Sequence, residues 1–154
     1  MRETEVVVTE LADFARVAAE ERGLCVVTTL RDDSTIQASV VNAGVGEHPG
    51  SGAVGVVLVA AGGSRKLANL LTRPRTTVIA RSGWQWAAVE GGAELIGPDD
   101  PVAGMSADDL RLALRAAFVA AGGTHDDWDE YDRVMAAERR AIVFITPDRV
   151  YSNG

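Results

Sequence analysis

The sequence predicts a single α+β domain in which a mostly antiparallel sheet closes into a barrel. Its 154 residues are the size of one ordinary domain. Five or six strand-like segments are present, and most of them follow one another as hairpins, which is typical of antiparallel barrels. The helical segments are grouped and do not alternate with the strands, which disfavours a parallel sheet. We find no internal repeat, low-complexity tract or linker, so residues 1–154 are interpreted as one domain.

The first half of the chain predicts one helix and three strands. Apolar residues recur at helical spacing from Leu11 to Ala18, behind Thr9 as a suitable N-cap and before Gly23 as a helix end. Two segments rich in β-branched residues then flank a polar turn, which predicts a β-hairpin. A glycine-rich loop and a strongly apolar strand follow. The hairpin strands, the loop and the apolar strand comprise residues 24–30, 36–43, 44–52 and 53–60.

The second half predicts three helices and a further set of strands. A short helix over residues 65–72 ends before Pro74, because proline cannot continue a helix. A long helix begins at Ser106 with a capping-box pattern and ends at Gly122. A third helix, with an aromatic face, is expected to begin at Thr124. The strands of this half comprise residues 76–81, 84–97, 141–146 and 149–152, the last two on either side of Pro147.

Composition and charge exclude several classes of protein. The net charge of −7 and the pI near 4.8 disfavour a nucleic-acid partner, because phosphate neutralisation supplies most of that affinity. No apolar run reaches the roughly 20 residues of a membrane helix, so no membrane partner is expected. Residues 1–5 carry acids where a secretory signal has a basic region, and Cys25 is the only cysteine. We therefore expect a cytoplasmic protein.

The positive charge is concentrated in one segment of this acidic chain. No Asp or Glu occurs between His48 and Val89. All the basic residues of that segment lie close together in sequence: Arg65, Lys66, Arg73, Arg75 and Arg81. A local cationic field in an acidic protein suits a small anionic ligand. The alternative is that these residues pair with the acids of the second half, which is the more common outcome for any one of them taken singly.

The strongest local signal is a glycine turn that opens a basic helix. Gly62 and Gly63 follow an apolar strand, and Arg65 and Lys66 open the next helix behind Ser64. Free N–H groups and a partial positive charge at a helix N-terminus bind phosphate, whereas basic first-turn residues oppose the helix dipole unless an anion is present. The segment is not a Walker A loop. The alternative is a surface helix that happens to begin with basic residues.

Other candidate motifs do not indicate a site. Gly44–Gly46 lacks the third glycine of a dinucleotide-binding fingerprint. The acidic segment 125–130 suits a helix start without any metal, and no second His or Cys cluster completes a metal site, so no metal is expected. Cys25 lies in an apolar strand, which indicates a buried thiol. Trp84 and Trp86 alternate along one strand, where such pairs are usually core residues.

Three blocks in this order and spacing resemble a known family over nearly the whole chain. The blocks are Arg65-Lys66-x-x-Asn69-Leu70 with Arg73-Pro74-Arg75; Gly83-Trp84-x-x-Ala87-x-Val89-Glu90-Gly91-x-Ala93-Glu94-Leu95; and His125-Asp126-Asp127-Trp128-Asp129-Glu130-Tyr131 with Pro147-Asp148-Arg149-Val150-Tyr151. They are similar to the flavin/deazaflavin oxidoreductases of the pyridoxamine-5′-phosphate-oxidase-like split-barrel superfamily. More narrowly, they resemble the branch using coenzyme F420, which includes F420-dependent biliverdin reductases.

The resemblance implies a homodimer of six-stranded antiparallel split β-barrels with flanking helices, and cofactor sites at the subunit interface. Lys66 matches the lysine that such proteins place on the cofactor phosphate. Ser64, Arg65, Asn69 and Leu70 lie beside it, and Ser64 stands where some relatives carry another basic residue. The strand segment implied to back the ring system comprises Gln37, Ala38 and Ser39. Trp84 and Trp86 would come from the partner subunit.

The function that the resemblance implies is hydride transfer between F420 and a conjugated small molecule, such as a biliverdin-like tetrapyrrole. Hydride transfer is the chemistry of the cofactor, so no protein nucleophile is required and no catalytic residue is assigned. FMN-dependent oxidation of a pyridoxamine-phosphate type uses the same phosphate pocket and remains open. Further alternatives are a non-catalytic cofactor carrier and a small-anion sensor without a redox cofactor.

Overall fold

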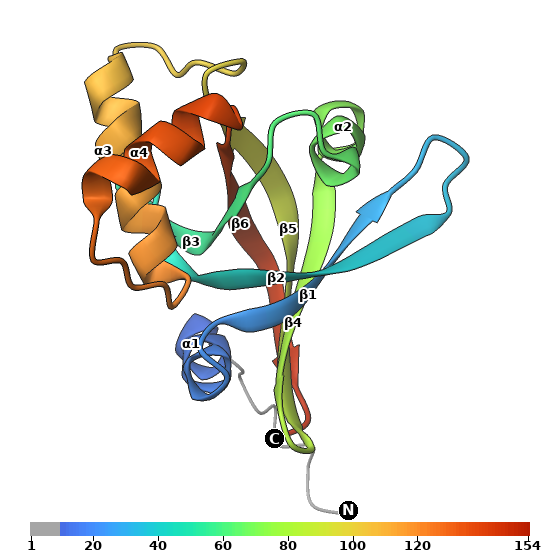
Figure 1. The fold of residues 1–154 in the computed structure, drawn as a ribbon. Coiled ribbons are helices and arrows are strands. Elements are labelled where there is room, and N and C mark those ends of the chain that lie inside the picture. Colours follow the sequence, from blue (N-terminus) through green and yellow to red (C-terminus); the bar gives the residue numbers. More distant parts are fainter. Residues whose placement is uncertain (1–9) are drawn as a thin grey trace, which may run out of the picture.

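The computed structural model describes residues 10–154, in which six strands form a closed antiparallel barrel (Figure 1). The strands follow one another around the barrel in the order β1-β2-β3-β6-β5-β4, and every neighbouring pair is antiparallel. Three neighbouring pairs are far apart in sequence and share no hairpin: β1 with β4, β3 with β6 and β5 with β6. The bounds are β1 Leu24–Leu30, β2 Ile36–Glu47, β3 Val54–Ala60, β4 Arg75–Ser82, β5 Gln85–Ile96 and β6 Ala141–Ser152.

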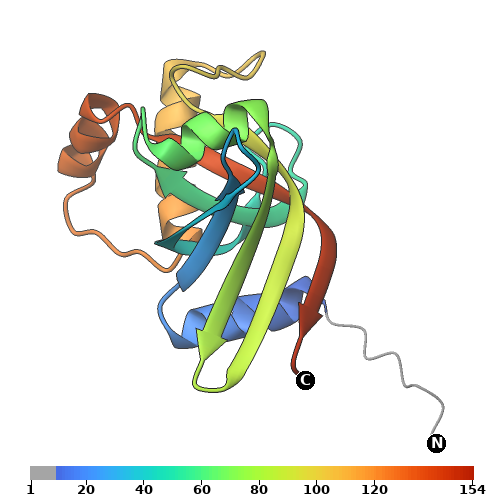
Figure 2. The same cartoon turned by 90° about the vertical axis from the view of Figure 1, so that its right-hand side faces the viewer.

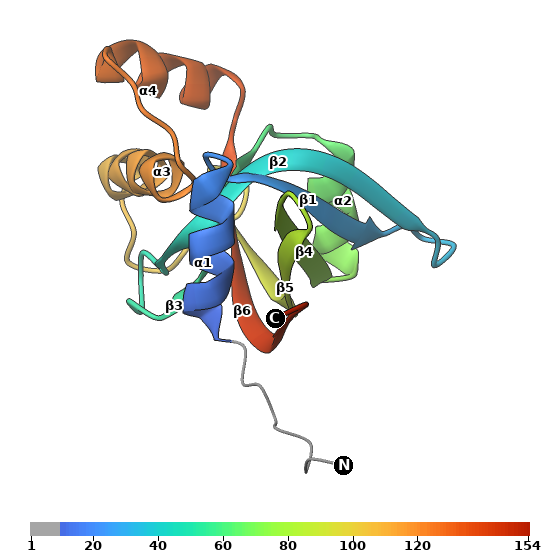
Figure 3. The same cartoon turned by 90° about the horizontal axis from the view of Figure 1, so that it is seen from below.

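Two helices close the ends of the barrel. The helix α1, Leu11–Glu20, lies across the lower end, and α2, Arg65–Thr72, lies at the upper end (Figures 1 and 3). Phe14 and Val17 of α1 and Leu70 of α2 belong to the same buried cluster as the inward-facing strand residues. Each helix therefore supplies the apolar side chains that shield the barrel interior from water at its own end.

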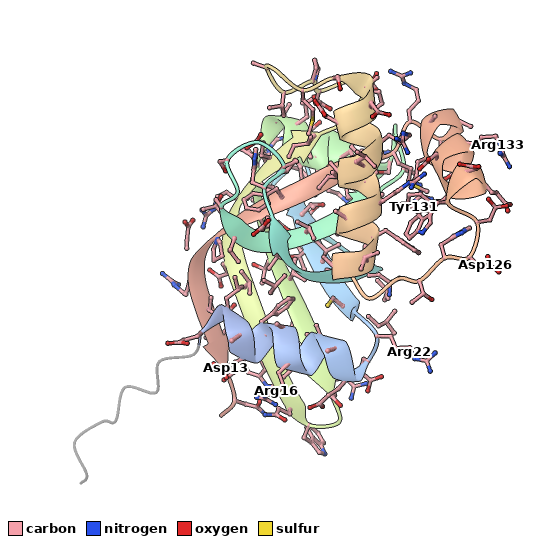
Figure 4. All side chains as sticks on the ribbon, turned by 90° about the vertical axis from the view of Figure 1, so that its left-hand side faces the viewer. Asp13, Arg16, Arg22, Asp126, Tyr131 and Arg133 are labelled. Atoms are coloured by element: carbon pink, nitrogen blue, oxygen red, sulfur yellow. The ribbon has the colours of Figure 1, made fainter. Side chains whose placement is uncertain are left out.

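The other two helices pack on the outside of the sheet. The helix α3, Ala107–Ala120, lies against β2, β3 and β6, and α4, Trp128–Ala137, lies against α3. Tyr131 of α4 points toward α3 (Figure 4) and donates its O–H to the backbone carbonyl of Leu114 at 2.9 Å. Burial raises the pKa of Tyr131 to about 12. None of the helices within residues 10–154 has the length and apolar character that crossing a membrane requires.

Most predicted elements are confirmed, and three boundaries are corrected. The β2 strand continues to Glu47 through the predicted loop, because Gly44–Glu47 pairs with β3. The last helix begins at Trp128 and not at Thr124, because Asp127 is the N-cap and accepts a hydrogen bond from the Glu130 N–H. The predicted N-cap Thr9 lies outside the described residues, and Glu10 occupies the N-cap position.

A further correction concerns the C-terminal strands. The segment around Pro147 is one continuous strand, β6, and Pro147 is paired with Gly91 where the register shifts. Proline has no backbone N–H to offer to a sheet, and a bulge removes the need for one at that position. The two predicted strands on either side of Pro147 are therefore halves of one strand.

One face of the sheet carries no helix. Figure 2 shows the outer surface of β4, β5 and β6 toward the viewer, with no helix over it. The strand register places one outward-facing row across five strands: Val40, Val26, Ile79, Ala88 and Tyr151. We call this surface of β2, β1, β4, β5 and β6 the uncovered face. Val40 is 65% exposed and Ile36, on the same side of β2, is 64% exposed, so its β2 edge is apolar and open to solvent.

Glycines allow the end of α3 to contact β2 directly. A Cβ atom added at Gly44 would lie 1.9 Å from the carbonyl oxygen of Ala120, and one added at Gly46 would lie 2.9 Å from Val57. Real Cβ atoms do not approach a backbone oxygen this closely, so the contact between α3 and β2 depends on the absence of a side chain. The N-terminal end of α3 instead faces the loop between β2 and β3, residues 48–53.

We predict that Gly44→Ala destabilises the protein by about 1–3 kcal/mol or more, because α3 must move away from β2 to admit the methyl group. Gly92→Ala is the matched control, since a Cβ atom there would meet only the Pro74 carbonyl oxygen at 3.8 Å. Urea unfolding should give a lower free energy of unfolding for the first variant and little change for the second. Equal free energies of unfolding for the two variants would contradict the packing role of Gly44.

Candidate phosphate-binding site

A glycine turn positions the N-terminus of α2 directly after β3. Gly63 has φ +75°, a left-handed conformation that favours glycine, and nothing lies within 4 Å of the position of its missing Cβ. Gly62 packs against the end of α4, where a Cβ atom would lie 2.5 Å from the carbonyl oxygen of Arg139. The turn therefore packs against the end of α4 at Gly62 and has free space beside Gly63. The first N–H groups of α2 follow directly after it.

Ser64 is the N-cap residue of α2, but its side chain does not cap the helix. Its Oγ is buried and makes no hydrogen bond to any of residues 10–154. The first turn of α2 also contains no acidic residue. A buried hydroxyl without a partner costs free energy, and the first N–H groups of a helix have no acceptor within the helix. Both features fit an anion that accepts hydrogen bonds at this point.

The two basic residues of the first turn have no anionic partner among residues 10–154. Neither Arg65 nor Lys66 forms a side-chain hydrogen bond or ion pair within that part of the chain. Two of the other arginines of the basic segment behave differently. Arg73 pairs with Asp32, and Arg75 pairs with Asp148. Pairing with an acid of the second half, the alternative weighed from the sequence, therefore accounts for Arg75 alone. Arg73 pairs with an acid of the first half, and Arg81 donates to the backbone carbonyl of Gly83 and has no acidic partner among residues 10–154. Arg65 and Lys66 are left uncompensated at the start of α2.

Asn69 fixes α2 onto the barrel and brings two of the predicted site residues together. Its Nδ2 group donates to the Gln37 Oε1 and the Thr29 Oγ1, each at 3.0 Å. Asn69 is 5% exposed and Thr29 is 2% exposed, so these bonds form away from solvent, where they are strongest. Sequence reasoning missed Thr29. The only available signal was its inward position in a strand whose other inward residues, such as Val27, are apolar.

The remaining predicted site residues lie in three different places: on either side of β2 and in the barrel core. Ser39 lies on the same side of β2 as Gln37 and is partly buried. Ala38 lies on the other side, on the uncovered face, opposite Thr28. Leu70 is 2% exposed and packs in the barrel core. Leu70 therefore acts on the site by holding α2 in place, because its side chain is not accessible to a ligand.

The two predicted tryptophans lie at the other end of the barrel from α2. Trp84 is 93% exposed in the turn between β4 and β5, so the expectation of a core position is wrong for this residue. Hairpin turns face solvent, and the turn lies one residue further along the chain than the pattern indicated. Trp86 is partly buried and packs edge-on against Tyr151, with ring centroids 6.0 Å apart. The β4–β5 turn lies at the opposite end of the barrel from α2 (Figures 1 and 2).

Neither Cys25 nor Tyr151 is poised to act as a nucleophile. Burial raises the pKa of the Cys25 thiol to about 11, which agrees with the buried thiol expected from the sequence. The Tyr151 O–H donates to Glu90 at 2.5 Å, and this hydrogen bond to Glu90 raises the pKa of Tyr151. Within residues 10–154, no group of three or more His, Cys, Asp or Glu side chains is arranged to hold a metal ion.

The barrel topology defines the fold class as the split β-barrel, and solved structures of that class resemble this chain. No protein-family model matches the sequence. A conserved hypothetical protein from Mycobacterium tuberculosis is 18% identical, with a TM-score of 0.63 over 99% of this chain and 88% of that one. An F420 reductase is 12% identical, with a TM-score of 0.58 over 94% of this chain and 98% of that one.

A third similar structure is a pyridoxamine 5′-phosphate oxidase-related, FMN-binding protein from Nostoc punctiforme. It is 12% identical, with a TM-score of 0.59 over 92% of this chain and 81% of that one. At these identities the comparisons establish the fold, and they agree with the six-stranded antiparallel split barrel expected from the sequence.

Proposed function

We propose that this protein is an F420-dependent oxidoreductase that holds the phosphate of its deazaflavin cofactor at the N-terminus of α2. The observation that carries the proposal is the uncompensated cationic pair, Arg65 and Lys66, beside the unpartnered hydroxyl of Ser64. Such a first turn is unfavourable in the absence of an anion, because its charges oppose the helix dipole. A phosphate removes that conflict, accepts from the Ser64 hydroxyl and binds the free N–H groups.

The residues around α2 support a ligand that extends from the phosphate along β1 and β2. Lys66 and Arg65 would hold the phosphate, and Asn69 would keep the helix in register with Gln37 and the neighbouring Ser39 of β2. When bound, a deazaflavin supplies hydride transfer, and the protein supplies position and electrostatics. The substrate we propose is a conjugated small molecule that stacks on the ring, of which a biliverdin-like tetrapyrrole is one example. The similarity to an F420 reductase and to an FMN-binding protein supports a flavin-type cofactor, and the sequence blocks favour F420.

We further propose that two copies of the chain form a homodimer through the uncovered face. Its outward-facing Val26, Val40 and Ile79 are apolar, and a sheet surface of this kind is normally covered. The β4–β5 turn, which contains the exposed Trp84, and α2 lie at opposite ends of the barrel (Figure 1). An antiparallel arrangement of two copies would bring Trp84 and Trp86 of one subunit toward the α2 of the other, which supports a cofactor site shared between subunits.

We predict that the protein binds F420 more tightly than FMN. The F420-type sequence blocks favour the deazaflavin, whereas both cofactors offer a phosphate to the same helix N-terminus. Equilibrium titration of the full-length protein with each cofactor, followed by absorbance and fluorescence, measures the two dissociation constants. Tighter binding of FMN would replace the proposal with an FMN-dependent oxidase. Tight F420 binding without reduction of any conjugated acceptor would indicate a carrier.

We predict that Lys66→Ala lowers cofactor affinity about ten- to hundredfold. The variant loses a charge-assisted hydrogen bond worth roughly 1.5–3 kcal/mol, and about 1.4 kcal/mol corresponds to tenfold in affinity. The apo-protein should be no less stable, because the lost charge opposed the dipole of α2. Added salt should weaken cofactor binding by wild type more than by the variant, because one screened attraction is gone.

Arg133→Ala is the control for the Lys66 variant. Arg133 is an exposed cation on α4 that points away from the barrel (Figure 4), and its loss changes the net charge by the same amount. We expect cofactor affinity of this variant to match wild type within about twofold, a change well below 1.4 kcal/mol. A Lys66→Ala protein that binds cofactor as tightly as wild type would refute the assignment of the phosphate site to α2.

We predict that the wild-type protein is a dimer at micromolar concentration and that Val40→Asp makes it monomeric. Val40 lies on the uncovered face, and a carboxylate there would be buried without a partner in an obligate interface, which typically exceeds about 2,000 Å². Val119→Asp is the matched control, because Val119 is 54% exposed on α3, away from that face. Light scattering gives the mass of each protein. A monomeric wild type, or a monomeric Val119→Asp protein, would contradict the proposed interface.

A further inference from the structure

A cavity of about 840 Å³, separate from the candidate phosphate site, lies on the side of the barrel that α3 covers. One wall is α3, from Asp109 to Ala120, and the opposite wall is the loop that joins β2 to β3, residues 48–53. Figure 4 looks onto this side of the molecule, with the loop beside α3. The α2 site does not contribute to it, because none of residues 64–70 lines the cavity. Its volume falls within the roughly 300–1,000 Å³ of small-molecule sites.

The cavity exists because α3 contacts β2 at one end only. At the C-terminal end of α3 the missing side chains of Gly44 and Gly46 allow direct contact with Ala120. Toward its N-terminal end, α3 faces the loop, and the helix presents alanines, Leu112 and Asp109 toward the space. Ile142 and Val57 of the sheet form the floor. The α3 wall and the floor of this space are mostly apolar, whereas the loop wall is polar.

The loop wall of the cavity is held in place by His48. The Nδ1 atom of His48 accepts hydrogen bonds from the N–H groups of Gly50 and Ser51 at 3.0 and 3.1 Å. Its Nε2 atom therefore carries the proton and donates to the Glu94 carboxylate at 3.1 Å. The ring also packs edge-on against Phe144, with centroids 5.0 Å apart. These four contacts fix the loop, so the cavity is formed before any ligand binds, which lowers the entropic cost of binding.

The charges around the cavity all have one sign. Glu47 and Asp109 line it, and its lining residues include no lysine or arginine. Asp109 accepts a hydrogen bond from the Ser106 N–H at 2.9 Å, and this bond lowers the pKa of its carboxyl, so the charge persists at neutral pH. Glu94 adds a third carboxylate behind His48. A space with an apolar wall and floor and two lining carboxylates is complementary to a molecule that has an apolar body and one positive charge.

We propose that this cavity is a second binding site, distinct from the phosphate site, for a small apolar amine in its protonated form. The apolar part of the ligand lies against Ala113, Ala117 and Ile142, and its ammonium group lies at the rim, near Glu47 and Asp109. Apolar burial supplies most of the affinity, and the carboxylates select the cation over neutral and anionic analogues. The site does not depend on the identity of the cofactor at α2.

The test compares three probes of matched shape: 4-phenylbutylamine, 4-phenylbutanol and 4-phenylbutyrate. Each is titrated into the full-length protein labelled with ¹⁵N, and amide shifts are followed in two-dimensional spectra. We expect saturable shifts of the amides of Gly50, Ser51 and the α3 residues that line the cavity. The amine should bind roughly two- to fivefold more tightly than the alcohol, as expected for partly exposed charges, and the butyrate most weakly.

Two pairs of variants separate the apolar and the charged contributions. Ala116→Leu places a larger side chain in the cavity from an exposed helix position and should abolish amine binding, whereas Val119→Leu, an exposed residue of α3 outside the lining, should not. Glu47→Gln should weaken binding of the amine about two- to fivefold and leave the alcohol unchanged. Glu21→Gln, an exposed acid after α1, is its control and should bind both as wild type does.

Several results would overturn the proposal. These are the absence of saturable amine binding by wild type, equal affinities for the three probes, and unchanged binding by a folded Ala116→Leu protein. Leu112→Ala provides an independent check should Ala116→Leu fail to fold, because it removes an apolar side chain from the lining without adding volume and should also weaken binding of the amine. Lys66→Ala must bind the amine as wild type does. Loss of amine binding by Lys66→Ala would show that the probes occupy the cofactor site. If the protein binds the amine but not the cofactor, the proposed function fails and the proposal of an amine site stands.

Discussion

A closed barrel of six strands has two open ends, and the rest of this structure depends on how those ends are sealed. Phe14 and Val17 close one end from α1, and Leu67 and Leu70 close the other from α2. Because α2 is only eight residues long, burying its leucines fixes where its N-terminus must lie. The bonds from Asn69 to Thr29 and Gln37 then set its rotation. The position of the candidate phosphate site is thus a by-product of shielding the core from water.

The two candidate sites differ in how the protein distributes its charge. At α2 the cations stand without partners, although the chain as a whole carries a net charge of −7. Several arginines elsewhere are paired with acids, as with Arg111 and Arg115 around Asp132 between α3 and α4. At the α3 cavity the carboxylates face a space that contains no basic lining residue. Regions of opposite sign on opposite sides of one small barrel can select two ligands of opposite charge without competition between them.

Local patterns predicted those parts of the fold that local interactions determine. The hairpin of β1 and β2 and the bounds of α2 follow from β-branched alternation and from Pro74, and both are found where expected. Long-range strand pairing could not be predicted from local patterns. Gly44–Glu47 is recognised as strand only from its pairing with β3. The same limit explains the site. Lys66 could be singled out from its place in a helix start, and Asn69 from the resemblance. The role of Thr29, the exposure of Trp84 and the solvent-facing side of Val40 require the barrel itself.

The placement of Cys25 has a kinetic consequence. It is the single cysteine of the chain, it is 3% exposed, and its side chain points into the barrel core. A thiol reagent can reach it only when β1 separates from β2 or β4, since those strands flank it on both sides. At high reagent concentration the rate of modification equals the rate at which the barrel opens, and at low concentration it reports the population of the open form. The native chain thus contains its own reporter of barrel opening, with no label to be engineered and no second thiol to confuse the signal.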